Sequence, residues 1–406
     1  MRALDVRGKH ILAGAAALAM LASLNMAHAA GFRVLYSFTG GSDGAYPEAS
    51  LIKDSAGNLY GTTAGGGIGY GYGTVFELAP DGTETVLYAF TGGSDGNDPT
   101  AGLLKDKAGN FYGTTAFGGA HHYGTVFKLA PDGTETVLHA FTSGADGADP
   151  FAGLIKDKAG NLFGTTDFGG GTSGNGTVFK LAPDGTETVL HAFTGGNDGD
   201  DPIGGLIKDS AGNLYGVTAL GGSADCEGSG CGTVFELAPD GTETVLYAFT
   251  GGSDGAGPSA SLIRDSAGNL YGTTQGGGGT SCSDGYGCGT VFELAPDGTE
   301  TVLYAFTGGS DGANPFTAGL IRDKAGNLYG TTDFGGGLGY GVVFRLAPDG
   351  TERVLHSFGV SGGDGAAPSA SLIRDSAGNL YGTTQGGGDT GCNNPYGCGT
   401  VFTLRK

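Results

Sequence analysis

Short apolar runs alternate with glycine-rich polar segments along most of the chain. Runs such as GTVFEL and TVLYAF are rich in Val, Leu, Phe and Tyr, which favour strands, and none has the period of a helix. Val75, Phe76 and Leu78 stand close together, so both faces of such a strand are expected to be buried. The segments KDSAGN and APDGTE between the runs suit tight hairpin turns. The pattern therefore predicts an all-β, antiparallel fold.

This pattern repeats along the sequence. The asparagine of the motif AGNLYGTT recurs every 51 to 58 residues, at Asn58, Asn110, Asn161, Asn213, Asn269, Asn327 and Asn379. Each unit contains four strand candidates, of the types SLIKD, NLYGTT, GTVFEL and TVLYAF. Units of this length and strand content are typical of β-propeller blades.

The two ends of the chain complete one unit between them. The last GTVFEL-type segment, residues 399–404, has no TVLYAF segment after it, whereas a segment of that type, Arg33–Phe38, precedes the first unit. A ring in which the N-terminal strand completes the last blade accounts for this offset. We therefore predict a seven-bladed β-propeller with four antiparallel strands in each blade. A β-solenoid is the alternative, but its terminal edges would need caps.

The order of the motifs identifies a family resemblance. GSDGxxP, AGNLYGTT, a glycine-rich loop and GTVFELAPDGTETVLYAF follow one another in an arrangement that resembles the GloVer tandem repeats of bacterial exported proteins. The resemblance covers the chain after residue 29. It implies a repeat protein that is secreted or attached to the cell surface, and it brings no catalytic motif. Because no anchoring segment follows the last repeat, we expect release rather than attachment.

The N-terminal segment predicts export. A basic start with Arg2, Arg7 and Lys9 is followed by a short apolar run, and small residues at Ala27 and Ala29 suit signal peptidase. We predict a signal peptide at residues 1–29, a propeller at residues 30–406, and a secreted or periplasmic protein. No later segment is apolar enough for insertion into a membrane.

Cysteine use agrees with an oxidising compartment. The six cysteines form three local pairs in glycine-rich loops: Cys226 with Cys231, Cys282 with Cys288, and Cys392 with Cys398. We predict a disulfide in each pair. Zinc binding is the alternative, but no histidine lies near any pair in the sequence.

The acidic composition limits the partners. The chain has 20 basic and 41 acidic residues, and after removal of the leader 17 basic residues stand against 40 acidic ones. Such a charge repels phosphate backbones, so nucleic acid is not expected as a partner. A glycan, a surface polymer or a protein remains as the expected partner class.

The predicted strand order divides the ring into two faces. If SLIKD is the innermost strand, both tight turns lie at one end of each blade. The long loops before SLIKD and between NLYGTT and GTVFEL then lie at the other end. These loops carry nearly all the variation between units, so we expect binding residues on this variable face.

The position after each GTT-like triplet is expected to point toward the channel mouth. It is alanine in three units and polar in the others, at Asp167, Gln275, Asp333 and Gln385. Phe168 and Phe334 follow the two aspartates, and Tyr286 and Tyr396 lie in the glycine-rich loops. Carboxylates beside aromatic rings suit sugar binding, so these eight residues are the predicted ligand contacts. For the tyrosines, packing over the blades is an equal alternative.

A second set of aspartates recurs before a glycine in every unit. Its members are Asp43, Asp95, Asp146, Asp198, Asp254, Asp311 and Asp364, with Asp98, Asp149, Asp200 and Asp201 nearby in the sequence. One interpretation is Ca²⁺ coordination, the sole cofactor expectation; the other is a structural turn in which the carboxylate accepts backbone N–H groups. No copy has the ligand spacing of a dedicated calcium loop, so we favour the turn. His139, His191 and His356 replace tyrosine in a repeated strand, which indicates a structural position.

Near-identical repeats favour binding over catalysis. The sequence contains no serine elbow, cysteine–histidine arrangement or metal triad, so no catalytic residue is assigned. The leading hypothesis is a secreted binding or scaffold propeller. A carbohydrate-active hydrolase or lyase that uses Asp167 and Asp333 is the first alternative, and a matrix protein without a ligand is the second.

Overall fold

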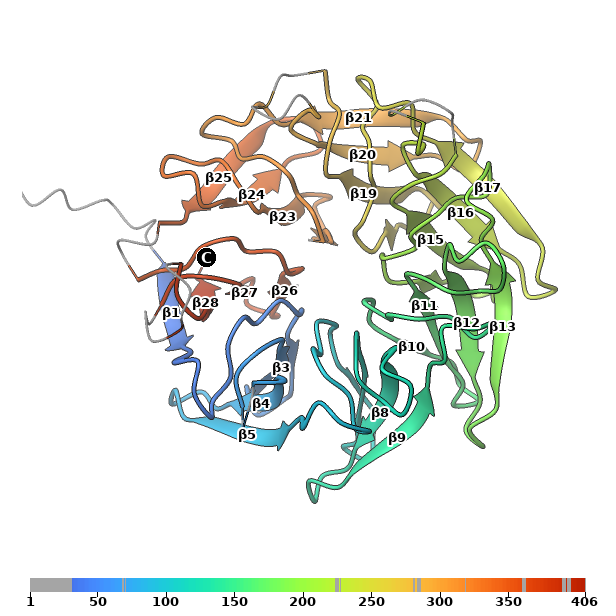
Figure 1. Ribbon diagram of the computed structural model, residues 1–406. Coiled ribbons are helices and arrows are strands. Elements are labelled where there is room, and N and C mark those ends of the chain that lie inside the picture. The colour runs from blue at the N-terminus through green and yellow to red at the C-terminus, as the bar shows by residue number, and fades with distance from the viewer. Residues whose placement is uncertain are drawn as a thin grey trace, which may run out of the picture.

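A computed structural model describes residues 31–405, apart from residues 68, 70, 223–225, 227, 280–281, 283–285, 318, 360–362, 389–391 and 393–395. The predicted signal peptide, residues 1–29, lies outside the described residues. Seven four-stranded antiparallel sheets surround one central axis (Figure 1), so the predicted seven-bladed β-propeller is confirmed.

The four strands of each blade follow the repeated motifs. The first strand, of two residues, comes from the SLIKD segment: β2 (Ile52–Lys53), β6 (Leu104–Lys105), β10 (Ile155–Lys156), β14 (Ile207–Lys208), β18 (Ile263–Arg264), β22 (Ile321–Arg322) and β26 (Ile373–Arg374). The second strand comes from NLYGTT: β3 (Leu59–Thr63), β7 (Phe111–Thr115), β11 (Leu162–Thr166), β15 (Leu214–Thr218), β19 (Leu270–Thr274), β23 (Leu328–Thr332) and β27 (Leu380–Thr384).

The outer half of each blade comes from the two more apolar segments. The third strands are β4 (Thr74–Leu78), β8 (Thr125–Leu129), β12 (Thr177–Leu181), β16 (Thr233–Leu237), β20 (Thr290–Leu294), β24 (Val342–Leu346) and β28 (Thr400–Leu404). The fourth strands are β5 (Glu84–Ala89), β9 (Glu135–Ala140), β13 (Glu187–Ala192), β17 (Glu243–Ala248), β21 (Glu300–Ala305), β25 (Glu352–Ser357) and β1 (Phe32–Ser37). We number the blades 1 to 7 from β2 to β28.

The N-terminal strand closes the ring as predicted. Blade 7 has the strand order β1-β28-β27-β26 (Figure 1). Phe32 on β1 pairs with Leu404 on β28. The same backbone groups that would form an open sheet edge are therefore hydrogen-bonded.

Phenylalanines hold neighbouring blades together. Phe38, which follows β1, meets Phe76 of β4 edge to face, with ring centroids 5.2 Å apart, and six equivalent pairs have the same separation. Both rings are fully buried. The second strand has a glycine, Gly61, where a Cβ atom would lie 2.8 Å from the ring of Phe76. The glycine of LYGTT thus makes room for the ring.

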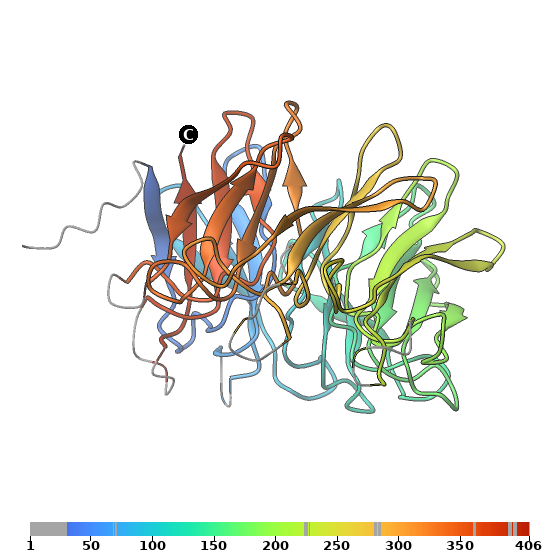
Figure 2. The same ribbon diagram turned by 90° about the horizontal axis from the view of Figure 1, so that it is seen from above.

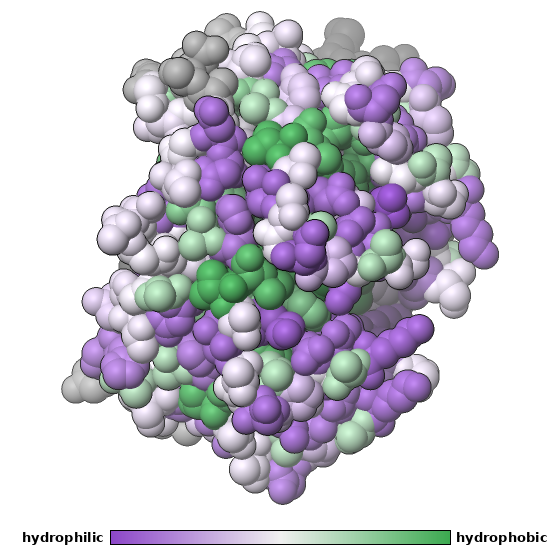
Figure 3. Space-filling view, turned by 90° about the vertical axis from the view of Figure 1, so that its right-hand side faces the viewer, coloured by the Kyte–Doolittle hydropathy of each residue, from purple (hydrophilic) through white to green (hydrophobic). Residues whose placement is uncertain are grey.

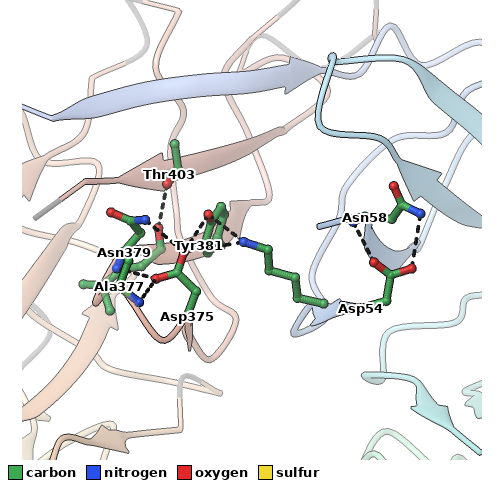
Figure 4. A network of polar contacts seen from close by, with 9 residues as sticks. Asp54, Asn58, Asp375, Ala377, Asn379, Tyr381 and Thr403 are labelled. Carbon is green, nitrogen blue, oxygen red and sulfur yellow. Dashed lines mark hydrogen bonds and ion pairs between the residues drawn. The ribbon is translucent and has the colours of Figure 1, made fainter. Parts of the chain in front are cut away.

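The two ends of the blades differ as the motifs predict. Hairpins project from one side of the ring and loops crowd the other (Figure 2). At the hairpin side, Asp375 accepts hydrogen bonds from the backbone of Ala377 and Asn379 and from the hydroxyl of Tyr381 (Figure 4). Lys53 of blade 1 also bonds Tyr381, which ties blade 7 to blade 1. The nearly invariant turn sequence is therefore explained by a structural network.

The surface is mixed rather than uniformly polar. On the flank shown in Figure 3, small apolar patches are separated by hydrophilic side chains. In the part of the chain that the structure describes, no helix is long and apolar enough to cross a bilayer.

The predicted disulfides are confirmed, with Cys226 bonded to Cys231, Cys282 to Cys288 and Cys392 to Cys398. Each pair packs against the first glycine of the next TGG segment, as at Gly251. In blades 1 and 3, Tyr72 and Asn175 fill the same place, against Gly92 and Gly195. The disulfides are therefore one of several ways to hold the loop against its neighbour.

Candidate functional site

A cavity of about 570 Å³ lies at the axis on the variable face. All seven blades contribute to it through the segment that leads into the first strand. Its lining consists of Glu48–Ser50, Asp98, Thr100–Gly102, Phe151–Gly153, Ile203, Gly205, Ser259, Ser261, Phe316, Thr317 and Ser369–Ser371, together with Asp167, Asp333 and Gln385. Small residues dominate the positions just before the first strands, where seven segments converge on the axis.

A repeated backbone turn aims side chains into this cavity. The residue before the proline has a positive φ in every blade, for example 62° at Asp98 and 55° at Asp149. Its carbonyl accepts a hydrogen bond from the residue that follows the GTT-like triplet; the distance is 3.1 Å from the Asp167 nitrogen to the Asp149 oxygen. Left-handed backbone is unfavourable for residues other than glycine. The turn nevertheless recurs in all seven blades, and in each of them the residue after the proline lines the cavity.

The charges around the cavity are unevenly distributed. Blades 1, 2, 3 and 6 contribute the acidic residues Glu48, Asp98, Asp167 and Asp333, whereas blades 5 and 7 contribute serines. Burial, and then the carboxylates of Asp201, Asp149 and Asp200, raise the pKa of Asp167 to about 7. The near-identical repeats thus build an asymmetric site.

Two further carboxyl groups at the cavity also have raised pKa values. Burial raises the pKa of Asp98 to about 6. Burial and then the charge of Glu48 raise the pKa of Asp333 to about 7. Near neutral pH these groups exist in both protonation states, so each can donate or accept a hydrogen bond.

Several oxygens at the channel mouth accept no hydrogen bond from the protein. They are Oδ1 of Asp167, Oδ1 of Asp333 and Oγ1 of Thr100; these three residues line the cavity, and each of these atoms is buried. Asp167 as a whole is only 8% exposed. An unpaired buried acceptor costs about 1–3 kcal/mol, so a ligand with hydrogen-bond donors would gain if the carboxyl group of Asp167 or Asp333 turned this oxygen toward the cavity.

The structure brings together only part of the predicted ligand set. Asp167, Asp333 and Gln385 line the cavity, and Gln385 donates a hydrogen bond of 2.6 Å to Glu48. The side chain of Gln275 lies beside Gly257 and is not part of the lining. The predicted aromatic contacts, Phe168, Phe334, Tyr286 and Tyr396, also lie outside the lining and are 44–55% exposed.

Sequence reasoning missed Glu48, Phe151 and Phe316. All three follow the proline of the lead-in segment, where the seven blades carry Glu, Thr, Phe, Ile, Ser, Phe and Ser. The variation of this position beside an invariant proline could have identified these three residues as candidates.

The repeated aspartates that we considered for calcium are bonded to protein groups. Asp43 accepts hydrogen bonds from the backbone and hydroxyl of Thr39, at 2.8 and 2.6 Å, and from the hydroxyl of Tyr36. His356 takes the place of the tyrosine and lies 3.0 Å from Asp364, so its structural role is as predicted. Within the described ranges, no three His, Cys, Asp or Glu side chains lie close enough to hold a metal ion. The calcium interpretation stays a prediction.

Comparisons with known proteins agree with the fold. No curated protein matches the chain. The extracellular domain of a putative one component system from B. thetaiotaomicron has a TM-score of 0.56 at 12% identity, over 92% of this chain and 40% of that one. The chain thus spans less than half of that protein. A gluconolactonase from Xanthomonas campestris is more distant, with a TM-score of 0.43, 18% identity and coverage of 74% and 85%, and supports no functional argument.

The family comparison covers almost the whole sequence. The Gloeobacter/Verrucomicrobia repeat matches residues 14–171, 144–318 and 279–406, which confirms the resemblance noted from the motifs. The chain therefore belongs to the Gloeobacter/Verrucomicrobia repeat family.

Proposed function

We propose that this protein is an extracytoplasmic binding propeller that holds a glycan, or another hydroxyl-rich surface polymer, at the mouth of its central channel. The observation that carries the proposal is that Asp167 and Asp333 line the cavity and that each has a carboxylate oxygen that accepts no hydrogen bond from the protein. Three disulfides support the extracytoplasmic location.

The chemistry of the cavity suits a sugar. Hydroxyl groups can donate to the unpaired carboxylate oxygens, and the rings of Phe151 and Phe316 offer apolar surface for a sugar face. The cavity volume of about 570 Å³ lies within the usual range of small-ligand sites. One or two residues of a polymer can therefore enter while the rest extends over the variable face.

The test is a glycan and polysaccharide binding screen with purified residues 30–406, once with calcium and once with a chelator. Asp167→Ala and Asp333→Ala are then measured on any ligand found. Alanine occupies the same position in blades 1, 2 and 4, at Ala64, Ala116 and Ala219, so the fold tolerates it. Asp184→Ala, on an exposed hairpin turn, removes the same charge at the opposite face.

We expect each cavity variant to bind about tenfold more weakly or worse, because a hydrogen bond to a charged group is lost. Asp184→Ala should bind like the wild type. Equal affinity for all three variants would refute the cavity as the binding site. If binding were lost only in the presence of the chelator, this result would support calcium coordination by the repeated aspartates.

A hydrolase or lyase is the second candidate. It is favoured by one observation: Asp167 and Asp333 line the same cavity, and burial raises the pKa of each to about 7, as a general acid near neutral pH requires. Polysaccharides bound in the screen should be incubated with the protein and assayed for new reducing ends. Activity that survives Asp167→Asn and Asp333→Asn would exclude this mechanism.

A further inference from the structure

A second cavity, of about 420 Å³, lies between blades 6 and 7, away from the central channel. Arg345 of β24 and Arg353 of β25 approach it from blade 6, and Arg374 of β26 and Arg405, just after β28, approach it from blade 7. Four of the seven arginines in the described part of the chain therefore surround one space, although the protein as a whole is strongly acidic.

The register of blade 6 sets two of these charges side by side. Arg345 and Arg353 are directly opposite each other in the antiparallel pair β24–β25. Like charges at such positions destabilise a sheet. The five other blades with this hairpin pair Glu or Lys with threonine: Glu77 with Thr85, Lys128 with Thr136, Lys180 with Thr188, Glu236 with Thr244 and Glu293 with Thr301. The arginine pair is thus specific to blade 6.

In the described part of the chain these arginines form no close ion pair, although the charge of Arg345 helps to lower the pKa of Asp349. Among the described residues, the salt bridges within 4.0 Å include none of the four arginines. By contrast, Arg322 and Lys53, which hold the place of Arg374 in blades 6 and 1, pair with Asp265 and Asp375. Arg345 donates a hydrogen bond of 3.2 Å to the amide oxygen of Asn327. Arg374 lies over the ring of Tyr329, 6.0 Å from its centroid.

Apart from Tyr329 and Gly378, the rest of the cavity lining is aliphatic. Val354, Leu355, Leu380 and Leu404 line it beside the arginines. Arg353, Arg374 and Arg405 are exposed, and Arg345 is half-buried, so a ligand can enter from solvent. An apolar surface lowers the local dielectric constant and strengthens the attraction between a guanidinium group and an anion.

We propose that this space is a binding site for a ligand that carries two or more oxyanion groups, as carboxylate, sulfate or phosphate. Guanidinium groups bind such groups through paired N–H donors, and the adjacent Arg345 and Arg353 can hold one oxyanion while Arg374 or Arg405 holds the next. The site is independent of the channel mouth and of the function proposed for it.

The test uses isothermal titration calorimetry of purified residues 30–406 with three probes: citrate for carboxylates, pyrophosphate for phosphates and sucrose octasulfate for sulfates. Sucrose is the uncharged control. The double variant Arg345→Glu with Arg353→Thr restores the pair found in blade 1, Glu77 with Thr85, and should fold for that reason. Arg33→Thr is the matched control, because exposed Arg33 holds the place of Arg353 on the outer strand of blade 7 and does not line the cavity.

We expect at least one probe to bind the wild type with a 1:1 stoichiometry, and we expect its affinity to fall as NaCl is raised. The probe that binds identifies the oxyanion. The double variant should bind at least about tenfold more weakly, since charge-assisted hydrogen bonds are lost, while Arg33→Thr should bind within about twofold of the wild type. The proposal is overturned if no probe binds, if sucrose binds equally well, or if the double variant retains the wild-type affinity.

Discussion

Six glutamates should make the ring less stable as the pH rises toward neutrality. Each begins the outer strand of its blade, has a buried Oε1 atom without a hydrogen-bond partner, and lies near a repeated aspartate; they are Glu84, Glu135, Glu187, Glu243, Glu300 and Glu352. Burial, and then the charge of that aspartate (Asp43 for Glu84), raises the pKa of each to about 7. We expect replacement of all six by glutamine to stabilise the protein above pH 7.

The direction of this change in stability with pH follows from proton binding. The ordinary pKa of a glutamate carboxyl is 4.5, whereas the pKa in the folded protein is about 7, so between these values the folded chain holds protons that the unfolded chain has released. The stability from these groups is complete below pH 4.5, falls as the pH rises to about 7, and then stays low. The full shift corresponds to about 3 kcal/mol per group. Because the carboxyl groups are only partly buried, solvent screening reduces this to about 1 kcal/mol.

Repetition makes the effect measurable. The six sites are far apart, so their contributions should add to about 6 kcal/mol at pH 8.5, which corresponds to roughly 8 °C in melting temperature for a chain of this size. At pH 5 the variant and the wild type should differ by a small fraction of this. Differential scanning calorimetry at the two pH values gives both melting temperatures.

A control separates this effect from the relief of net charge. The six aspartates of the APDGTE turns, Asp81, Asp132, Asp184, Asp240, Asp297 and Asp349, accept backbone hydrogen bonds that lower their pKa. Replacing them by asparagine removes the same number of charges but should destabilise the protein at pH 8.5. If both sixfold variants gained equal stability, general charge repulsion would be the cause and the reasoning from burial would be wrong.

Two other predictions concern packing and the loops. Gly164→Ala should destabilise the fold by about 1–3 kcal/mol, because the new Cβ atom would lie 2.8 Å from the fully buried ring of Phe179. Gly102→Ser is the control, since Ser50 holds the equivalent place in blade 1. Equal melting temperatures for the two variants would contradict the clash with Phe179. Replacing both Cys226 and Cys231 by serine should cost about 2 kcal/mol, as expected for a short closed loop. Thermal unfolding measures this loss, and an unchanged melting temperature would mean that the loop is held by other contacts.

The fold could be predicted from the sequence because its signals are local and repeated. Tight turns, strand composition and the unmatched segment Arg33–Phe38 all pointed to one closed ring, and each cysteine had its partner within six residues. The exposed loop aromatics that the sequence singled out do not line the cavity, and their role as ligand contacts stays a prediction. The aromatic residues of the cavity, Phe151 and Phe316, reach the axis through a left-handed turn before proline, and a strand pattern does not show where such a turn directs a side chain.

The second cavity, between blades 6 and 7, could not be predicted from the sequence for a different reason. Arg345 and Arg353 become neighbours only through the register of a hairpin, and Arg374 and Arg405 join them only when two blades pack. No single repeat contains the cluster. Properties that arise between repeats therefore need the three-dimensional arrangement, even where every repeat is understood.

Ring closure also affects the order in which the strands can fold. Because Phe32 pairs with Leu404, the first strand to be synthesised finds its partner only when the last strand is present. Until then β1 has no β-sheet partner, and the hairpins of the other blades can form from local contacts alone. Closing so long a stretch of chain is slow compared with forming a hairpin, so we expect the final step of folding to be the docking of β1. During that interval the open strand edges are the part of the molecule most exposed to aggregation.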